Sequence, residues 1–301
     1  MQDWQIKRKV RGQRPRQATG NNLTTFHKLR KGKFVAKYIL TVTLNPVLDY
    51  AAKISRLSWA RDFYVPKFDS SAGGKGLNVS RTLRSFNIDS LATGFIGGAG
   101  GDWIEKKLRE EGIRNDFIKI SAEIRKSLTI IDSASSQVTR VIEQGPEVSA
   151  ARQTLFFSKF KSLLNRCQWV VISGRPALGI PNYFYRDLIA AANTAGVRTI
   201  LDTSGKAFQP GLKASPFLVK PNREEAEIFL KRKLETLTQI KKATQYFLKF
   251  GVKIVVISMG EKGAVAADGR ECWLAKAPPG KYSKYRRMRG RDAGRISLRL
   301  S

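Results

Sequence analysis

Three glycines and a lysine at residues 73–76 form the part of the sequence best suited to bind an anion. The run Gly73-Gly74-Lys75-Gly76 leads directly into a segment with helical periodicity. Glycines lack a Cβ atom and let backbone N–H groups approach an anion closely, while a helix start and the Lys75 ammonium add positive charge. Many such turns only connect a strand to a helix, so this cluster does not establish a site by itself.

A carboxylate follows the first apolar run of the chain. Asp49 comes after the run at 39–44 and the break at Asn45-Pro46. A carboxylate just past the C-terminal end of a strand lies where ligands bind to open α/β sheets, and it can accept two hydroxyl hydrogen bonds. Asp49 is therefore the first candidate for holding a hydroxylated ligand. The alternative is that it stabilises the turn after Asn-Pro.

Two later motifs combine glycine, lysine, amide and carboxylate groups. Lys220, Asn222 and Glu225 follow a short apolar run, and a second glycine-rich segment spans 258–263. Glycines let a backbone follow phosphate groups, and one carboxylate is sufficient for Mg²⁺, which keeps several waters. The alternatives are an ordinary hairpin turn at 258–263 and, for Glu225, favourable charge in the first turn of a helix.

Short β-branched runs alternate with segments of helical periodicity, which predicts βαβ units around a mostly parallel sheet. The predicted strands are Ile39–Leu44, Ser90–Ile96, Trp169–Ser173, Thr199–Asp202, Phe217–Val219 and Lys253–Ser258. The predicted helices are Gly76–Phe86, Trp103–Glu110, Ala150–Leu164, Pro181–Ala195, Arg223–Leu230 and Thr236–Phe250. Period-two alternation at 52–68 and 128–142 predicts antiparallel strands in addition.

Taken in order, these motifs resemble those of the ribokinase-like (PfkB) carbohydrate kinases over residues 38–279. Residues 44–49 and 74–81 are most similar to the 1-phosphofructokinase and tagatose-6-phosphate kinase branch. The resemblance implies a doubly wound α/β fold, with a mostly parallel sheet flanked by helices and a small β-sheet lid at about 50–70 and 126–143. It also implies phosphoryl transfer from ATP, with Mg²⁺, to a hexose phosphate. Fructose 1-phosphate, giving fructose 1,6-bisphosphate, is the first substrate candidate, and tagatose 6-phosphate is the second.

The resemblance assigns roles residue by residue. The residues implied to contact the sugar phosphate are Asp49, Gly73, Gly74, Lys75 and Asn78. Those implied to bind the nucleotide are Lys220, Asn222, Ser258, Gly260 and Gly263. Glu225 is implied to order Mg²⁺, usually through water, and the lid sheet is implied as a surface for a homodimer.

Two segments depart from the family pattern. In the second lid segment, Arg140 and Ile142 stand where the branch carries an acid and an amide, although Arg125 and Arg140 could still grip a sugar phosphate. After Pro279, a Gly-Ala-Gly-Asp sequence with the catalytic aspartate is expected. Residues 280–301 are instead arginine-rich and aperiodic, as after a shifted reading frame.

The catalytic base is therefore left unassigned, and Asp292 is expected to belong to a solvated basic tail. Positioned base catalysis contributes about 10²–10⁴-fold, so phosphoryl transfer is expected to be impaired. The absence of the family's terminal helices would also expose one face of the sheet. The alternative is a pseudokinase that binds sugar phosphate or nucleotide without catalysis.

The charge of the chain is unusual and unevenly distributed. Its 301 residues carry a net charge of +31. Residues 1–37 hold eleven Lys or Arg and one acid, and residues 276–301 hold nine and one. The first segment is expected to be an unstructured extension, with a transit peptide or a nucleic-acid-binding arm as alternatives. Because stacking aromatic residues are not interleaved with the basic ones, no specific nucleic-acid partner is expected.

Cysteine and hydropathy patterns restrict the compartment. The two cysteines, Cys167 and Cys272, and the single His27 give no framework for disulfides or zinc, which is typical of a reducing cytosol. No apolar run approaches the about 20 residues that span a bilayer. The sequence therefore predicts a cytoplasmic protein without a membrane partner.

Overall fold

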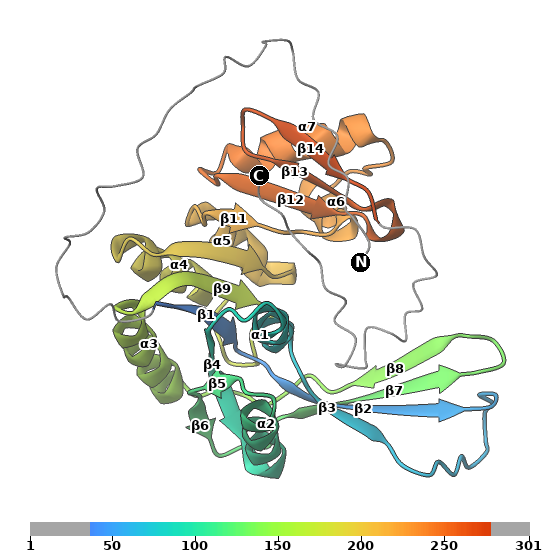
Figure 1. The fold of residues 1–301 in the computed structure, drawn as a ribbon. Coiled ribbons are helices and arrows are strands. Elements are labelled where there is room, and N and C mark those ends of the chain that lie inside the picture. Colours follow the sequence, from blue (N-terminus) through green and yellow to red (C-terminus); the bar gives the residue numbers. More distant parts are fainter. Residues whose placement is uncertain (1–36, 278–301) are drawn as a thin grey trace, which may run out of the picture.

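A mixed ten-stranded sheet forms the centre of the structure, a computed structural model that describes residues 37–277 (Figure 1). Across the sheet the strands are β14 (Cys272–Ala275), β13 (Ala264–Ala267), β12 (Ile254–Ser258), β11 (Leu218–Val219), β10 (Arg198–Asp202), β9 (Cys167–Ser173), β1 (Tyr38–Thr43), β4 (Ser90–Gly97) and β5 (Arg114–Asn115), with β6 (Ile118–Ile120) also paired to β4. Neighbours from β5 to β12 run parallel, and β12, β13 and β14 pair antiparallel. The predicted mostly parallel sheet is confirmed.

Helices lie on both faces of this sheet, as a doubly wound fold requires. The helices are α1 (Lys75–Ser85), α2 (Gly98–Glu110), α3 (Ala150–Leu164), α4 (Phe184–Thr194), α5 (Phe208–Lys213), α6 (Arg223–Leu230) and α7 (Leu237–Leu248), with 3₁₀ turns η1 (Gly205–Ala207) and η2 (Gly260–Lys262). α1 and α2 cover one face near β1 and β4, and α3, α4, α5 and α7 cover the other (Figure 1). β4 is buried along its whole length, which explains its continuous apolar sequence.

A second, four-stranded sheet extends away from the main one, at the lower right of Figure 1. Its order is β3 (Asp69–Gly73), β2 (Val47–Ile54), β7 (Arg125–Asp132) and β8 (Val138–Ile142). β2 pairs antiparallel with β3 and parallel with β7, and β7 and β8 form an antiparallel hairpin. The small sheet predicted beside the main one is therefore present, and it is called the lid sheet below.

The lid strands differ from the predicted ones in their limits. Residues 55–68 form no strand, although the period-two pattern extended to residue 68. β2 pairs with β7 only as far as Ile54 and Asp132, where β7 turns into its hairpin, so the chain beyond Ile54 has no strand to pair with. Asp49 lies within β2 rather than in a turn after β1, because Asn45-Pro46 separates two strands.

The helices differ from the predictions mainly at their starts. α2 begins at Gly98, five residues before Trp103, where Glu123 Oε1 accepts a hydrogen bond from the Gly100 backbone N–H at 2.9 Å. α4 begins at Phe184, three residues after Pro181. The sequence did not predict α5, β5, β6, β13 or β14, whose lengths of two to six residues are too short for a clear period.

Residues 1–36 and 278–301 lie outside the described part of the chain. The predictions for the two basic terminal segments and for Asp292 fall there. Within residues 37–277, no helix combines the length and the apolar character that crossing a membrane requires.

Candidate active site

The parallel strands bring most of the predicted residues to one edge of the main sheet, called the carboxyl edge here because strands β1 and β9–β12 all end at it. Asp202 and Ser258 are the last residues of β10 and β12, and Lys220 follows β11. α1 begins at the same edge with Lys75. The order of strands therefore collects residues that are far apart in the sequence.

A glycine allows α1 to start directly against the end of β1. A Cβ atom on Gly76 would lie 2.3 Å from Thr43 Oγ1 and 3.0 Å from the Val42 carbonyl oxygen, so only glycine fits this contact. Gly74, the N-cap of α1, has a φ of 139°, which L-residues with a side chain rarely adopt. The glycine run thus fixes where Lys75 leaves the backbone.

Asp202 connects the two lysines of the carboxyl edge. Its Oδ1 lies 3.1 Å from Lys75 Nζ, and its Oδ2 lies 3.3 Å from Lys220 Nζ. The Asp202 side chain is only 13% exposed, so both ion pairs are partly shielded from solvent. Asp202 is also the last residue of the predicted strand Thr199–Asp202, so it carries the same signal as Asp49, a carboxylate at the end of a strand, but it was not among the predicted site residues.

Asn222 and Glu225 form a capping box at the start of α6. Asn222 Oδ1 accepts a hydrogen bond from the Glu225 backbone N–H at 2.7 Å, and Glu225 Oε2 accepts one from the Asn222 N–H at 2.9 Å. The other oxygen, Glu225 Oε1, lies 3.8 Å from Lys75 Nζ. Glu225 therefore stabilises the helix start with one oxygen and faces the carboxyl edge with the other.

The glycine-rich segment at 258–263 connects β12 to β13 beside this capping box. The Ser258 backbone N–H donates a hydrogen bond to the Pro221 carbonyl oxygen at 3.1 Å. A Cβ atom on Gly263, whose φ is 89°, would lie 1.9 Å from the Ala275 carbonyl oxygen. Gly260 also has a positive φ, of 62°, but lies in open space. The backbone of this loop is therefore fixed next to Lys220 and Asn222.

Asp49 reaches the glycine run from the lid sheet. A Cβ atom on Gly73 would lie 2.0 Å from Asp49 Oδ2, so the carboxylate occupies the space that a side chain would fill. Asp49 Oδ1 and the neighbouring Ser127 Oγ are buried without a hydrogen-bond partner among the described residues. Because a buried polar atom without a partner is costly, this oxygen is suited to accept a hydrogen bond from a ligand.

The electrostatics around Asp49 oppose one another. Burial raises the pKa of Asp49, while the positive charges of Arg140, Arg125 and Arg81 lower it. The effect of burial is larger than that of the charges, so the pKa of Asp49 is higher than the ordinary value for this side chain. A carboxylate beside three guanidinium groups suits a ligand that carries both hydroxyl and phosphate groups.

Two of these arginines are positioned by contacts of their own. Arg125 donates hydrogen bonds to the Asn45 carbonyl oxygen from Nε and Nη2, at 3.3 and 3.2 Å. Arg81 Nε lies 2.7 Å from Glu111 Oε2, and Arg81 Nη1 donates to Asn78 Oδ1 at 3.0 Å. Asn78, predicted to contact the sugar phosphate, thus also orients an arginine near Asp49.

The carboxyl edge fits Mg²⁺ through two carboxylates. Asp202 and Glu225 both approach the ammonium group of Lys75, so their oxygens lie close to one another. Within residues 37–277, no group of three acidic, cysteine or histidine side chains gathers as a metal cage. This agrees with the preference of Mg²⁺ for one or two carboxylates, phosphate oxygens and retained waters. Asp202 and Glu225 would hold the ion, which would neutralise phosphate charge.

A continuous set of contacts joins the two groups of predicted residues. Asp49 touches Gly73, Gly73 leads to Lys75, and Lys75 pairs with Asp202 and faces Glu225. Lys75, predicted to contact the sugar phosphate, points its ammonium toward Asp202 rather than pairing with Asp49. It therefore lies between Asp49 on the lid sheet and the charged residues of the carboxyl edge.

Comparisons with known proteins agree with this geometry. The family described as pfkB family carbohydrate kinase matches residues 43–282. A mutant of phosphofructokinase-2 from Escherichia coli is 28% identical, with a TM-score of 0.77 over 81% of this chain and 80% of that one. The same enzyme in complex with fructose 6-phosphate is 27% identical, with a TM-score of 0.74 over 81% of each chain. A possible 1-phosphofructokinase from Thermotoga maritima is 28% identical, with a TM-score of 0.73 over 79% of this chain and 76% of that one.

The family match covers well over half of the chain, and these solved structures share its fold and are 27% or 28% identical to it where they align. The chain therefore belongs to the pfkB family of carbohydrate kinases, whose members are phosphotransferases.

Proposed function

We propose that this chain binds a fructose monophosphate beside Asp49 and MgATP beside Lys220, and that the transfer between them gives fructose 1,6-bisphosphate. The observation that carries this proposal is the row of contacts from Asp49 through Lys75 to Asp202 and Lys220. It connects a buried carboxylate suited to accept hydroxyl hydrogen bonds with cations suited to a triphosphate. Family membership supports the reaction class, and the contacts support the arrangement of the two ligands.

Fructose 1-phosphate is the first substrate candidate. The three guanidinium groups of Arg81, Arg125 and Arg140 near Asp49 suit a sugar that already carries a phosphate. The solved complex of the Escherichia coli enzyme contains fructose 6-phosphate, which makes this isomer the second candidate. Tagatose 6-phosphate is a third, because residues 44–49 and 74–81 are most similar to the 1-phosphofructokinase and tagatose-6-phosphate kinase branch. Arg140 and Ile142 depart from the pattern of that branch.

Lys75 is placed to stabilise charge during transfer. Its ammonium group lies between the Asp49 side and the nucleotide side, where the transferring phosphoryl group would pass. We assign no residue to accept the proton of the sugar hydroxyl, because the expected Gly-Ala-Gly-Asp sequence does not follow Pro279. We propose that both ligands bind and that the transfer is slow.

We expect binding without efficient turnover. Calorimetry should show saturable binding of fructose 1-phosphate and of MgATP, whereas coupled ADP release should stay at least about 10²-fold below the usual 1–10³ s⁻¹ of enzymes, because positioned base catalysis contributes at least that much. Parallel assays with fructose 6-phosphate and tagatose 6-phosphate rank the substrates. Turnover within the usual range would contradict the proposed impairment, and absence of binding would contradict the proposed function.

Asp49→Asn should bind sugar phosphate more weakly and yet be more stable. The pKa of Asp49 is raised by burial, so the ionised carboxylate destabilises the folded state at neutral pH, and neutral Asn removes this cost. The gain in unfolding free energy should shrink as the pH falls through the raised pKa, where Asp49 itself becomes neutral. The Kd for fructose 1-phosphate should rise about tenfold or more, because hydrogen bonds to a charged group contribute about 1.5–3 kcal/mol.

Urea unfolding at pH 7 and at acid pH, together with calorimetry, measures both effects. The matched control is Asp69→Asn on the neighbouring strand β3, whose side chain is exposed. It should change neither the stability nor the affinity. A loss of stability in Asp49→Asn at pH 7 would show that the carboxylate is better paired than these contacts indicate.

Glu225→Gln should separate metal binding from helix capping. Glutamine completes a capping box as well as glutamate does, so the unfolding free energy should change by less than about 0.5 kcal/mol. The Kd for MgATP should rise about tenfold, whereas the Kd for ATP without magnesium should not rise, because a negative charge near the phosphates is removed. Glu224→Gln, the adjacent exposed residue with the same charge change, is the control. Equal affinities of Glu225→Gln and wild type for MgATP would exclude the metal role.

We also propose that the lid sheet forms a homodimer in the cytoplasm. Val141 and Ile142 on β8, the edge strand, are 62% and 50% exposed, and Trp59 is 95% exposed in the loop after β2. Light scattering after gel filtration should give twice the chain mass. Val141→Asp combined with Ile142→Asp should give the mass of one chain, while Leu155→Asp on α3 should not. A monomeric wild type would contradict the proposed dimer.

A further inference from the structure

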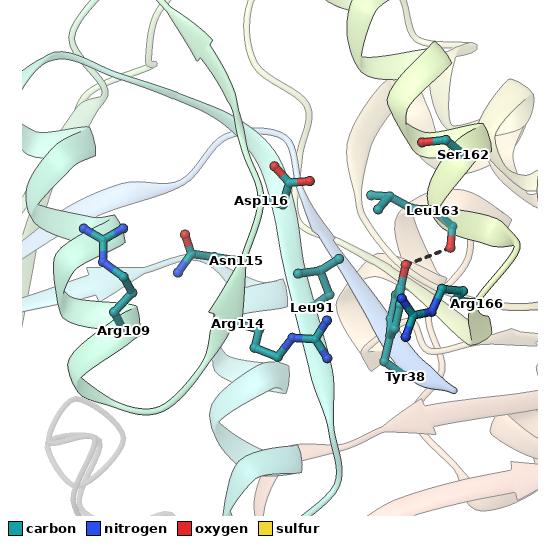
Figure 2. Close-up of a pocket in the computed structure, with 9 residues that line it drawn as sticks. All are labelled: Tyr38, Leu91, Arg109, Arg114, Asn115, Asp116, Ser162, Leu163 and Arg166. Carbon is teal, nitrogen blue, oxygen red and sulfur yellow. Dashed lines mark hydrogen bonds between the residues drawn. The ribbon is translucent and has the colours of Figure 1, made fainter. Parts of the chain in front are cut away.

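A cavity of about 530 Å³ opens at the edge of the main sheet opposite the carboxyl edge (Figure 2). Tyr38, the first residue of β1, and Leu91, near the start of β4, line it together with residues of α2, β5 and α3. β1 runs from this cavity to Thr43 at the carboxyl edge, a distance of about 17 Å at ~3.3 Å per residue. The cavity is therefore separate from the site described above.

Three arginines from three different elements line this cavity. Arg109 extends from α2, Arg114 from β5 and Arg166 from the segment between α3 and β9 (Figure 2). Arg114 pairs with Asp89 at 2.7 Å, and its guanidinium lies 5.6 Å from the centre of the Tyr38 ring. Arg109 and Arg166 form no ion pair within residues 37–277. Two of the three charges are thus available to a ligand.

The acidic residue of the cavity does not neutralise these arginines. Asp116 lines the cavity, but its carboxylate is paired with Lys159 Nζ. The Asp116–Lys159 pair therefore has no net charge. The lining therefore has an excess of positive charge, which attracts an anion.

Arg114 and Arg166 both affect the hydroxyl of Tyr38, which lines the cavity. Burial raises the pKa of the Tyr38 hydroxyl, and the charges of Arg114 and Arg166 oppose this rise. The hydroxyl is fixed by donating a hydrogen bond to the Leu163 carbonyl oxygen at 2.8 Å (Figure 2). The guanidinium groups of Arg114 and Arg166 thus both lie near the ring of Tyr38, which is held in place, and this limits the distance between the two groups.

We propose that this cavity binds a small organic molecule that carries two or more phosphate groups. A guanidinium group can donate two parallel hydrogen bonds to two oxygens of one phosphate group. Asn115 and Ser162 add an amide and a hydroxyl to the same lining. Leu91 and the ring of Tyr38 offer apolar surface for the carbon skeleton of the ligand. The volume lies within the range of about 300–1,000 Å³ that small-molecule sites occupy.

Calorimetric titration of the full chain with inorganic tripolyphosphate, without magnesium and at fixed ionic strength, tests this site. Wild type should show two classes of binding, one at the carboxyl edge and one in the cavity. Ser162→Glu places a carboxylate among the arginines at an exposed helical position, and it should weaken binding in the cavity at least tenfold. The double variant Arg109→Gln with Arg166→Gln should lose binding in the cavity. Lys220→Ala should weaken only binding at the carboxyl edge.

Thr154→Glu is the matched control, because it makes the same charge change at an exposed position two turns earlier on α3. It should change both affinities by less than twofold. Two results would overturn the proposed site: retention of both classes in Ser162→Glu and in the double arginine variant, or an equal loss in Thr154→Glu. The latter would show a general attraction of the basic chain for polyanions. Circular dichroism identifies a variant that fails to fold, and the other variant then decides.

Discussion

The arrangement of the carboxyl edge depends on the carboxylate of Asp202, which pairs with Lys75 at 3.1 Å and with Lys220 at 3.3 Å. Without it, the ammonium group of Lys220 would lose its ion pair, and that of Lys75 would keep only the longer contact with Glu225 at 3.8 Å. Together with Glu225, the group contains two positive and two negative charges, so it is balanced before any ligand binds. In the proposed function, a triphosphate or a metal ion would exchange partners with charges that are already in place, which would limit the cost of reorganisation.

The sequence singled out several residues of this site, but not the contacts that the structure gives them. Asn222 and Glu225 were expected to bind nucleotide and Mg²⁺, and their capping box was not predicted. Gly73 and Gly76 were selected for the close approach of an anion, whereas the structure shows that a Cβ atom there would collide with Asp49 and Thr43. The ion pair of Asp202 could not be predicted either, because its partner Lys75 lies 127 residues away. The placement of Asp49 within β2 was missed for the same reason: the strand exists because β7 pairs with it.

The part of the main sheet formed by β10, β11 and β12 is fully buried on one face and half-buried on the other. Leu201, Val219 and Val255 point into the large core under α4, α5 and α7, whereas Ile200, Leu218 and Ile254, aligned across β10, β11 and β12, are only half-buried. No helix among residues 37–277 covers that second row. The alternation along these strands therefore reflects a face that helices of the described residues cover and a face that they leave half-buried.

Asp49 illustrates how binding and stability conflict in this fold. Its buried Oδ1 has no partner among the described residues, and burial outweighs the three nearby arginines in setting its pKa. A sequence selected for stability alone would place an amide or an apolar group there. The carboxylate instead leaves an unmet hydrogen-bonding capacity directly beside Gly73, where the side chain of any other residue would collide with it. In the proposed function a hydroxyl-bearing ligand would supply the missing donors, so the stability given up by the free protein would be recovered as affinity.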